Sequence, residues 1–424
     1  MDPLLYQTYI DILKDELVPA MGCTEPIAVA YAGAIARKTL GCIPDRVELT
    51  VSGNIIKNVK SVIVPNTRGR KGLRCAVAAG IVFGNAEKEL QVISEASDAQ
   101  LQEMDRFLAG TEIHIAESDA KCPFDIQVHA SSGTDSAYVR IIGQHTNVVR
   151  LERNGEILKE LPFSDEAAPA PENRKLLSVE GIVEFADTAR IEDVQEILQR
   201  QIDYNTAIAE EGLKGGYGAG IGKILLQSYG NAVQNRAKAA AAAGSDARMN
   251  GCELPVIINS GSGNQGMTAS LPVIVYAIEC GVSKELLYRA LLVSNLVTIH
   301  LKTGIGTLSA YCGATSAGAG AGAGICYLYG GRYEQIAHTI VNALAINSGM
   351  ICDGAKASCA AKIASAVEAG LLGWQMNQND SEFYGGDGIV VKGVENTIRA
   401  VSELAREGMR STDDEIIRLM MDND

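Results

Sequence analysis

The stretch Gly349–Ala361, which reads GMICDGAKASCAA, places Cys352 and Cys359 among small residues. A continuous helix would separate two residues at this spacing by about 10.5 Å along its axis, which is too far for both thiols to bind one small group. We therefore expect the helix to be broken between them. Asp353–Gly354 predicts the break, because glycine adopts left-handed backbone readily and aspartate can cap a new helix beginning near Ala355.

A third cysteine, Cys312, lies upstream in the run SAYCGATSAGAGAGAG. The glycine and alanine residues of this run leave room for the backbone to close around a bulky group. The three cysteines are either ligands of one inorganic site or small buried side chains, since free cysteine is among the most buried residue types. As ligands, three thiolates without a fourth partner would leave one iron of a [4Fe–4S] cluster open for Lewis-acid chemistry on a substrate.

The composition predicts a soluble protein with a large core. The chain has 424 residues, of which 47% are hydrophobic, and a net charge of −14. This charge argues against nucleic acid and anionic membrane as partners, so we expect a small-molecule partner. Two charge-free windows, Leu254–Ile278 and Thr303–Gly331, are interrupted by polar and glycine-rich pieces, which favours buried helices over membrane spans. The apolar, helix-rich content also indicates a homo-oligomer.

The ten cysteines do not form short regular pairs, so a disulfide framework is not expected. The N-terminal segment MDPLLYQTYIDILKDEL carries acidic residues and lacks the basic and apolar regions of a secretory leader. Together these features predict a protein of the reducing cytoplasm.

Hydrophobic periodicity predicts an α+β fold, with a large, mainly helical cluster-binding domain and a smaller α/β domain in the N-terminal third. Helices are expected over 4–17 and over Thr24–Leu40, and two strands over 45–64. Further strands are expected from 111 to 161, with a hairpin at Asn154–Gly155, before a linker rich in proline and acidic residues at Pro162–Asn173. The predicted units are N-terminal helices (1–44) that pack on the helical domain, the α/β domain (45–173) and the helical domain (174–424).

Seven polar residues are candidates for substrate binding, and each also has a structural interpretation. The motif GSGNQG at 261–266 lies in a charge-free window, where its polar groups form a turn or bind an amino acid. The motif SGNIIKN at 52–58 lies at a predicted turn between strands, either at the surface or facing a cleft. Lys356, between Cys352 and Cys359, either lies at the surface or binds the substrate carboxylate or the charge of the cluster. The candidates are Ser262, Asn264, Gln265, Asn54, Lys57, Asn58 and Lys356.

Several motifs, in one order along nearly the whole chain, resemble those of the iron–sulfur L-cysteine desulfidase family, which is related to the iron–sulfur L-serine dehydratases. They are MGCTEP at 21–26, SGNIIKN at 52–58, GSGNQG at 261–266, the run around Cys312, and GMICDGAKASC at 349–359. The resemblance implies a [4Fe–4S] cluster with Cys312, Cys352 and Cys359 as ligands. It also implies that Cys23 is the proton acceptor.

Cys23 precedes the predicted helix that begins with Thr24, Glu25 and Pro26. The positive end of a helix dipole can lower the pKa of a thiol at this place, which suits a base. The negative charge of Glu25 opposes that effect, and Glu25 is itself a possible base.

The implied activity is that of a carbon–sulfur lyase, in which L-cysteine is converted to pyruvate, ammonia and hydrogen sulfide in cysteine catabolism. L-Serine dehydratase is the nearest alternative, by the same mechanism. Those enzymes typically carry a Ser-Ser-Ser-His-Thr stretch, whereas this chain offers only Ser-Ser-Gly-Thr at 131–134, and the departure favours cysteine. A non-catalytic iron–sulfur or amino-acid-binding protein is the alternative from another class.

Overall fold

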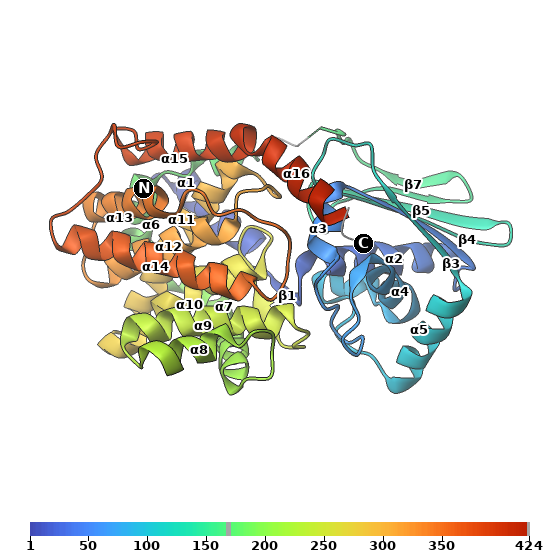
Figure 1. Ribbon diagram of the computed structural model, residues 1–424. Helices are drawn as coiled ribbons and strands as arrows, with labels where there is room; N and C mark the ends of the chain where they lie inside the picture. The colour runs from blue at the N-terminus through green and yellow to red at the C-terminus, as the bar shows by residue number, and fades with distance from the viewer. Residues whose placement is uncertain (167–170, 422–424) are drawn as a thin grey trace.

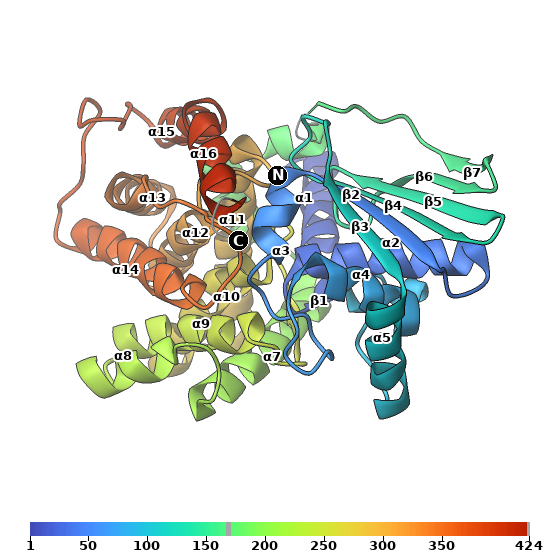
Figure 2. The same ribbon diagram turned by 45° about the vertical axis from the view of Figure 1, so that its right-hand side comes forward.

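The computed structural model describes residues 1–166 and 171–421. It has two parts that lie side by side, a helical body on the left of Figure 1 and an α/β domain on the right. The view in Figure 2 separates the sheet of the α/β domain from the helices beneath it. The α+β fold class predicted from the sequence is confirmed. The middle of the predicted linker and the last three residues of the predicted helical domain fall outside the described residues.

The α/β domain is built on one six-stranded sheet. Its strands are β2 (Arg46–Val51), β3 (Glu112–Glu117), β4 (Asp125–Ser132), β5 (Asp135–Ile142), β6 (Val148–Arg153) and β7 (Glu156–Glu160). The order is β3-β2-β4-β5-β6-β7, with β2 and β3 parallel and the other neighbours antiparallel. The predicted hairpin is confirmed, because Arg153 pairs with Glu156 across Asn154 and Gly155, which both have positive φ.

Four α-helices and a short 3-10 helix complete this domain. They are α2 (Thr24–Leu40), α3 (Gly53–Val59), α4 (Gly72–Phe83), η1 (Ala86–Gln91) and α5 (Asp98–Gly110). α2 lies along α4 and against β4 and β5. The two helices approach closely, since a Cβ on Gly80 would lie 1.9 Å from the carbonyl oxygen of Ala30.

The helical body consists of the N-terminal helix α1 and of the helices that follow the sheet in sequence. Its elements are α1 (Pro3–Glu16), η2 (Glu172–Leu176), α6 (Val179–Thr188), α7 (Ile191–Lys214), α8 (Ile221–Tyr229), α9 (Val233–Met249), α10 (Gly263–Cys280), α11 (Lys284–Ile305), α12 (Gly313–Leu328), α13 (Tyr333–Asn347), α14 (Cys359–Gln378), α15 (Val394–Glu403), η3 (Leu404–Gly408) and α16 (Arg410–Met421). The central α12 is fully surrounded by α10, α11, α13 and α14. Within residues 1–166 and 171–421, none of the helices combines the length and the hydropathy of a membrane span.

The alternating glycines of α12 allow two neighbouring helices to lie close to it. A Cβ on Gly318 would lie 2.2 Å from the carbonyl oxygen of Ala366 in α14. A Cβ on Gly320 would lie 2.6 Å from the carbonyl oxygen of Ser294 in α11. Both distances are far below van der Waals contact, so the glycines of this run serve helix packing. The sequence suggested instead that they make room for a bulky group.

The predicted N-terminal unit of residues 1–44 is wrong in one respect, because its two helices belong to different parts. α1 contacts α7 and η2 of the helical body, as expected, but α2 packs within the α/β domain. Helical periodicity shows that a segment is a helix without showing which neighbour covers its apolar face. The α/β domain therefore begins at α2 rather than at residue 45.

The second of the two strands predicted over 45–64 is also wrong. β2 ends at Val51, and α3 begins immediately after the N-cap residue Ser52. Ile55 and Val59 are buried one helical turn apart, and this spacing prevails over the alternation seen in the sequence.

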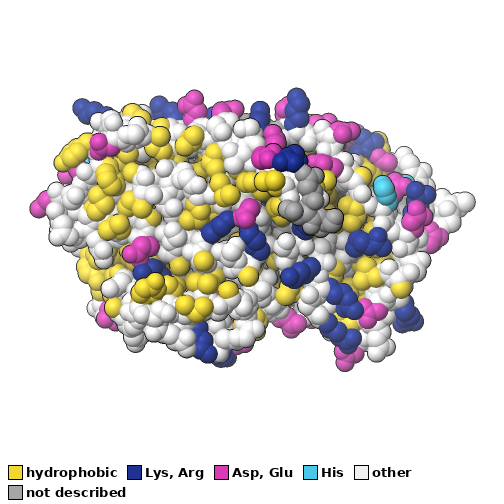
Figure 3. Space-filling view, in the orientation of Figure 1, with side chains coloured by type: hydrophobic (Ala, Val, Ile, Leu, Met, Phe, Trp, Pro, Cys, Tyr) yellow, Lys and Arg dark blue, Asp and Glu magenta, His cyan; other side chains and the backbone are white. Residues whose placement is uncertain are grey.

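α16 leaves the helical body and ends against α3 of the α/β domain (Figures 1 and 2). Asp413 forms an ion pair with Lys57, whose side chain is only 1% exposed, and the carbonyl of Met420 accepts a hydrogen bond from Lys60. The end of the chain thus ties the two parts together. On the face shown in Figure 3, hydrophobic side chains are most frequent over the helical body, whereas Lys and Arg gather over the middle and right.

Candidate active site

A short two-stranded ribbon brings MGCTEP next to GSGNQG, although the two motifs are far apart in sequence. It consists of β1 (Pro19–Met21) and β8 (Pro255–Ile257), which run antiparallel. After β1 the chain turns at Gly22, which has a φ of +58° and lies against Pro65, and reaches Cys23. Thr24 Oγ1 then donates to the carbonyl oxygen of Gly261 at 2.9 Å. The start of α2 therefore faces the loop before α10.

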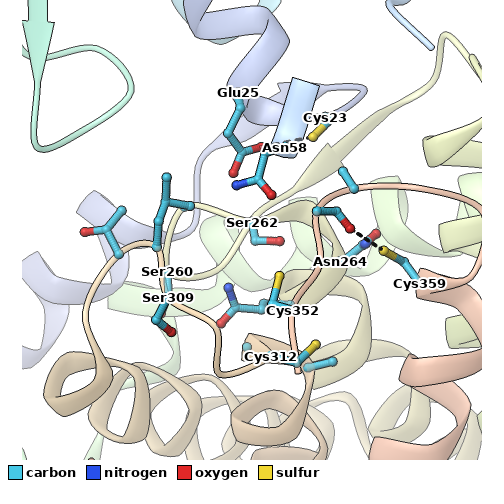
Figure 4. A pocket seen from close by; sticks show the side chains of 18 of the residues that line it. Cys23, Glu25, Asn58, Ser260, Ser262, Asn264, Ser309, Cys312, Cys352 and Cys359 are labelled. Carbon is cyan, nitrogen blue, oxygen red and sulfur yellow. Dashed lines mark hydrogen bonds between the residues drawn. The ribbon is translucent and has the colours of Figure 1, made fainter. Parts of the chain in front are cut away.

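The three cysteines predicted as ligands line one cavity of about 100 Å³ (Figure 4). Cys312 is the N-cap residue of α12, Cys352 lies in the loop after α13, and Cys359 is the first residue of α14. Two backbone hydrogen bonds join the loops that carry the first two. Cys312 N–H donates to the carbonyl of Met350 at 3.0 Å, and Cys352 N–H donates to that of Ala310 at 2.6 Å.

The predicted break between Cys352 and Cys359 is present, but it is longer than expected. Gly354 has a φ of +90°, which is the left-handed conformation that glycine was expected to supply. However, α14 begins at Cys359 rather than near Ala355. Asp353 does not cap the helix, because its carboxylate pairs with Lys356 of the same loop and with Lys362 near the start of α14.

The thiols of this cavity influence one another. The Cys312 thiol donates a hydrogen bond to Cys352, which lowers the pKa of Cys352 to about 6 against the opposing effect of burial, and the charge of Lys57 acts in the same direction. The same hydrogen bond, together with burial, raises the pKa of Cys312. Burial also lowers the pKa of the nearby Lys302 to about 8. Three soft sulfur donors thus line a cavity whose surroundings are cationic.

This donor set fits an iron–sulfur cluster better than a single metal ion. Within residues 1–166 and 171–421, no three His, Cys, Asp or Glu side chains converge closely enough to hold one ion. A cluster does not require such convergence, because each thiolate binds a different iron. Cys312, Cys352 and Cys359 are the residues that would hold it.

Cys23 lies across the cavity from Cys312 and Cys352, beside Glu25 and Asn58 (Figure 4). Its thiol is 2% exposed and donates to Glu25 Oε2 at 2.9 Å. Burial, and then the negative charge of Glu25, raise the pKa of Cys23 well above its usual value. The expectation that the helix terminus lowers this pKa is therefore wrong, because desolvation and the carboxylate outweigh the dipole.

The structure brings four of the seven substrate-binding candidates to the cavity and leaves three elsewhere. Asn54 lies in α3, outside the cavity lining, with a buried Oδ1 that has no hydrogen-bond partner in the described part of the chain. Lys57 is turned toward Asp413, and Lys356 donates to the carbonyl oxygens of Asp353 and Gly354. The four that line the cavity are Asn58, Ser262, Asn264 and Gln265.

Sequence reasoning missed several polar side chains that line the cavity. Arg248 is the last charged residue of the alanine-rich α9, and His145 comes from the loop between β5 and β6 of the α/β domain. Lys302 and Ser309 come from α11 and the loop after it. A lone arginine in the run AAAAAGSDARM was a usable signal, since a charge in a buried alanine-rich helix needs a reason.

Comparison with known proteins gives the family. Residues 86–418 match the family described as "Serine dehydratase alpha chain". The chain belongs to the serine dehydratase alpha chain family. Members of this family are iron–sulfur enzymes, which supports an iron–sulfur cluster in this chain. The matched residues include Arg248 and the three candidate ligands, whereas Cys23 lies before them.

Several curated relatives are similar to this chain over nearly its whole length. A UPF0597 protein of Desulfitobacterium hafniense (strain Y51) is 58% identical over 98% of this chain and 97% of its own length. A UPF0597 protein of Lachnoclostridium phytofermentans is 50% identical, over 98% of this chain and 100% of its own. One of Treponema denticola is 46% identical, over 99% of both chains. Their names state no activity.

Proposed function

We propose that this member of the serine dehydratase alpha chain family is an L-cysteine desulfidase, a carbon–sulfur lyase. The observation that carries the proposal is that three cysteines and the hydrogen-bonded Cys23–Glu25 pair line one cavity. The overall change is elimination of hydrogen sulfide from L-cysteine to give 2-aminoacrylate, which water converts to pyruvate and ammonia.

The side chains divide the work between two sides of the cavity. When bound by Cys312, Cys352 and Cys359, a [4Fe–4S] cluster would supply a Lewis acid for the leaving thiolate. Glu25 Oε2 accepts the hydrogen bond of the Cys23 thiol. We assign Cys23 Sγ as the base for the Cα proton of the substrate. Because burial and the charge of Glu25 raise the pKa of Cys23, the form that acts is the minor thiolate, whose proton has passed to Glu25 Oε2. Asn58, Ser262 and the other lining amides and hydroxyls are available for the polar groups of an amino acid.

Cysteine is favoured over serine as the substrate because a thiolate is a softer ligand than hydroxide and suits iron. The Ser-Ser-Gly-Thr stretch, where the serine dehydratases have Ser-Ser-Ser-His-Thr, points the same way. L-Serine dehydratase remains the second candidate, and the family description favours it. A non-catalytic cluster protein is less well supported, since it would need no base opposite the cysteines.

The test is an assay of protein purified without oxygen, in which pyruvate and sulfide are measured with L-cysteine and pyruvate with L-serine. We expect kcat/KM to be higher for L-cysteine, and D-cysteine is the control for stereochemistry. A higher kcat/KM for L-serine would assign the protein to the serine dehydratases. No pyruvate from either amino acid would favour the non-catalytic alternative.

The homo-oligomer and the cytoplasmic location stay predictions. Light scattering on the purified protein measures the first, and fractionation of cells measures the second.

A further inference from the structure

Arg248 carries a positive charge that is buried at the cavity, and it has no ion-pair partner among residues 1–166 and 171–421. Its side chain lines the cavity, and the residue is 2% exposed. Nη1 donates to Asn264 Oδ1 at 3.1 Å, but Nε and Nη2 are buried and have no hydrogen-bond partner within the described part of the chain. Burying a charged group without partners is costly, so an arginine in this state indicates a ligand that completes its hydrogen bonds.

The surroundings of Arg248 are shaped to hold the guanidinium in place. A Cβ on Gly263, the first residue of α10, would lie 2.4 Å from Nε. Glycine is therefore required where the side chain passes the start of that helix. The nearby carboxylate of Glu25 accepts a hydrogen bond from Cys23 on Oε2 at 2.9 Å, and it forms no ion pair with Arg248 among the described residues.

Two further lining residues next to this region also have unsatisfied polar atoms. His145 Nε2 and Gln265 Oε1 are buried without partners among the described residues. Gly261, the first residue of the GSGNQG motif, lies against the His145 ring, since a Cβ on it would be 3.0 Å from His145 Cε1. Donors and acceptors without partners among the described residues thus line one cavity, which is typical of a site for a small polar molecule.

We propose that Arg248 binds the α-carboxylate of the substrate through Nε and Nη2. These two N–H groups form the planar fork that matches a carboxylate with two parallel hydrogen bonds. The inference rests on the proposed function, because it takes the ligand to be an amino acid. It restricts the ligand to molecules with a free carboxylate and excludes amines and amino-acid amides. It also fixes the substrate next to Cys23, which lines the same cavity.

The experiment measures binding of ligands that cannot be eliminated, so it does not depend on turnover. L-Alanine, L-alaninamide and ethylamine are titrated calorimetrically into the iron-loaded protein without oxygen. Wild-type protein should bind L-alanine more tightly than L-alaninamide or ethylamine, which both lack the carboxylate. In Arg248→Met this preference should shrink by roughly 10- to 100-fold, the usual worth of hydrogen bonds between charged groups. Arg248→Lys should retain part of it.

Arg174→Met is the matched control, because Arg174 is a buried arginine that pairs with Glu16 in the helical body and does not line the cavity. It should leave the preference for L-alanine unchanged. Iron content is measured for every variant.

Two results would overturn the proposal. One is equal affinity of the wild type for L-alanine and L-alaninamide, a comparison that needs no variant to fold. The other is an Arg248→Met protein that keeps the preference for L-alanine but loses iron, which would make Arg248 a support of the cluster. Release of pyruvate and sulfide from L-cysteine is scored separately, so either proposal can fail while the other stands.

Discussion

Cys23 differs from the three candidate ligands in its partner, because its thiol donates a hydrogen bond to the neighbouring carboxylate of Glu25. We predict that Cys23→Ser keeps its iron and lowers kcat with L-cysteine by about 100-fold or more, as expected when a positioned base is lost. Iron analysis and steady-state kinetics on the same preparation measure both. Normal turnover by Cys23→Ser would make Glu25 the candidate base, and loss of iron from this variant would indicate that Cys23 is a ligand.

The ligand assignment separates Cys312, Cys352 and Cys359 from the other cysteines. Serine at any of the three should remove most of the iron and the activity. Cys326 is the control, since it is fully buried in α12 and lies outside the cavity lining. Cys326→Ser should retain iron and cost about 1 kcal/mol of stability. Iron loss from that variant alone would show that the ligand set is wrong.

At the scale of single residues, the sequence reveals reactive side chains more readily than their partners. Spacing and small neighbours mark Cys352 and Cys359, and both line the cavity. Lys57 could not be assigned correctly, because the carboxylate that holds it is Asp413, at the other end of the chain. The sequence offers a signal for Arg248, a charge in an alanine-rich helix, but its unpaired Nε and Nη2 among the described residues are visible only in the structure.

At the scale of elements, α12 depends on glycine for its contact with α14. Gly318→Ala should lower the free energy of unfolding by about 1–3 kcal/mol, because the added Cβ would meet the carbonyl oxygen of Ala366 at 2.2 Å. Gly110→Ala in α5 is the control, as a Cβ there would meet nothing within 4 Å. Denaturant unfolding measures both. Equal stability of the two variants would contradict the close helix contact.

Helix and strand boundaries were predictable where several local signals agree. The helix Thr24–Leu40 has the expected bounds, because an acidic residue and a proline begin it and glycine follows it. The segment after β2 has only a short apolar pattern, which fits the repeat of a helix as well as that of a strand. The sequence therefore predicted a strand where the structure has α3. The close approach of α12 to α11 and α14 requires the three-dimensional structure.

At the scale of the whole molecule, α16 connects the helical body to α3 of the α/β domain through the ion pair of Asp413 and Lys57. Asp413→Ala should cost about 3–5 kcal/mol of stability, because it leaves the charge of Lys57 buried and unpaired. Asp414→Ala, at an exposed neighbouring position, should change stability by less than about 0.5 kcal/mol. Thermal unfolding of both variants measures the difference, and equal melting temperatures would refute the role of the pair.

We propose above that Cys312, Cys352 and Cys359 hold one [4Fe–4S] cluster in a cavity that eliminates sulfide from L-cysteine. The most direct measurement is the iron and acid-labile sulfide content of protein purified without oxygen, taken together with its rate of sulfide release from L-cysteine. We predict a brown protein with about four iron and four sulfide per chain, which loses colour and activity together in air. A colourless, iron-free protein that releases sulfide at the full rate would contradict the account.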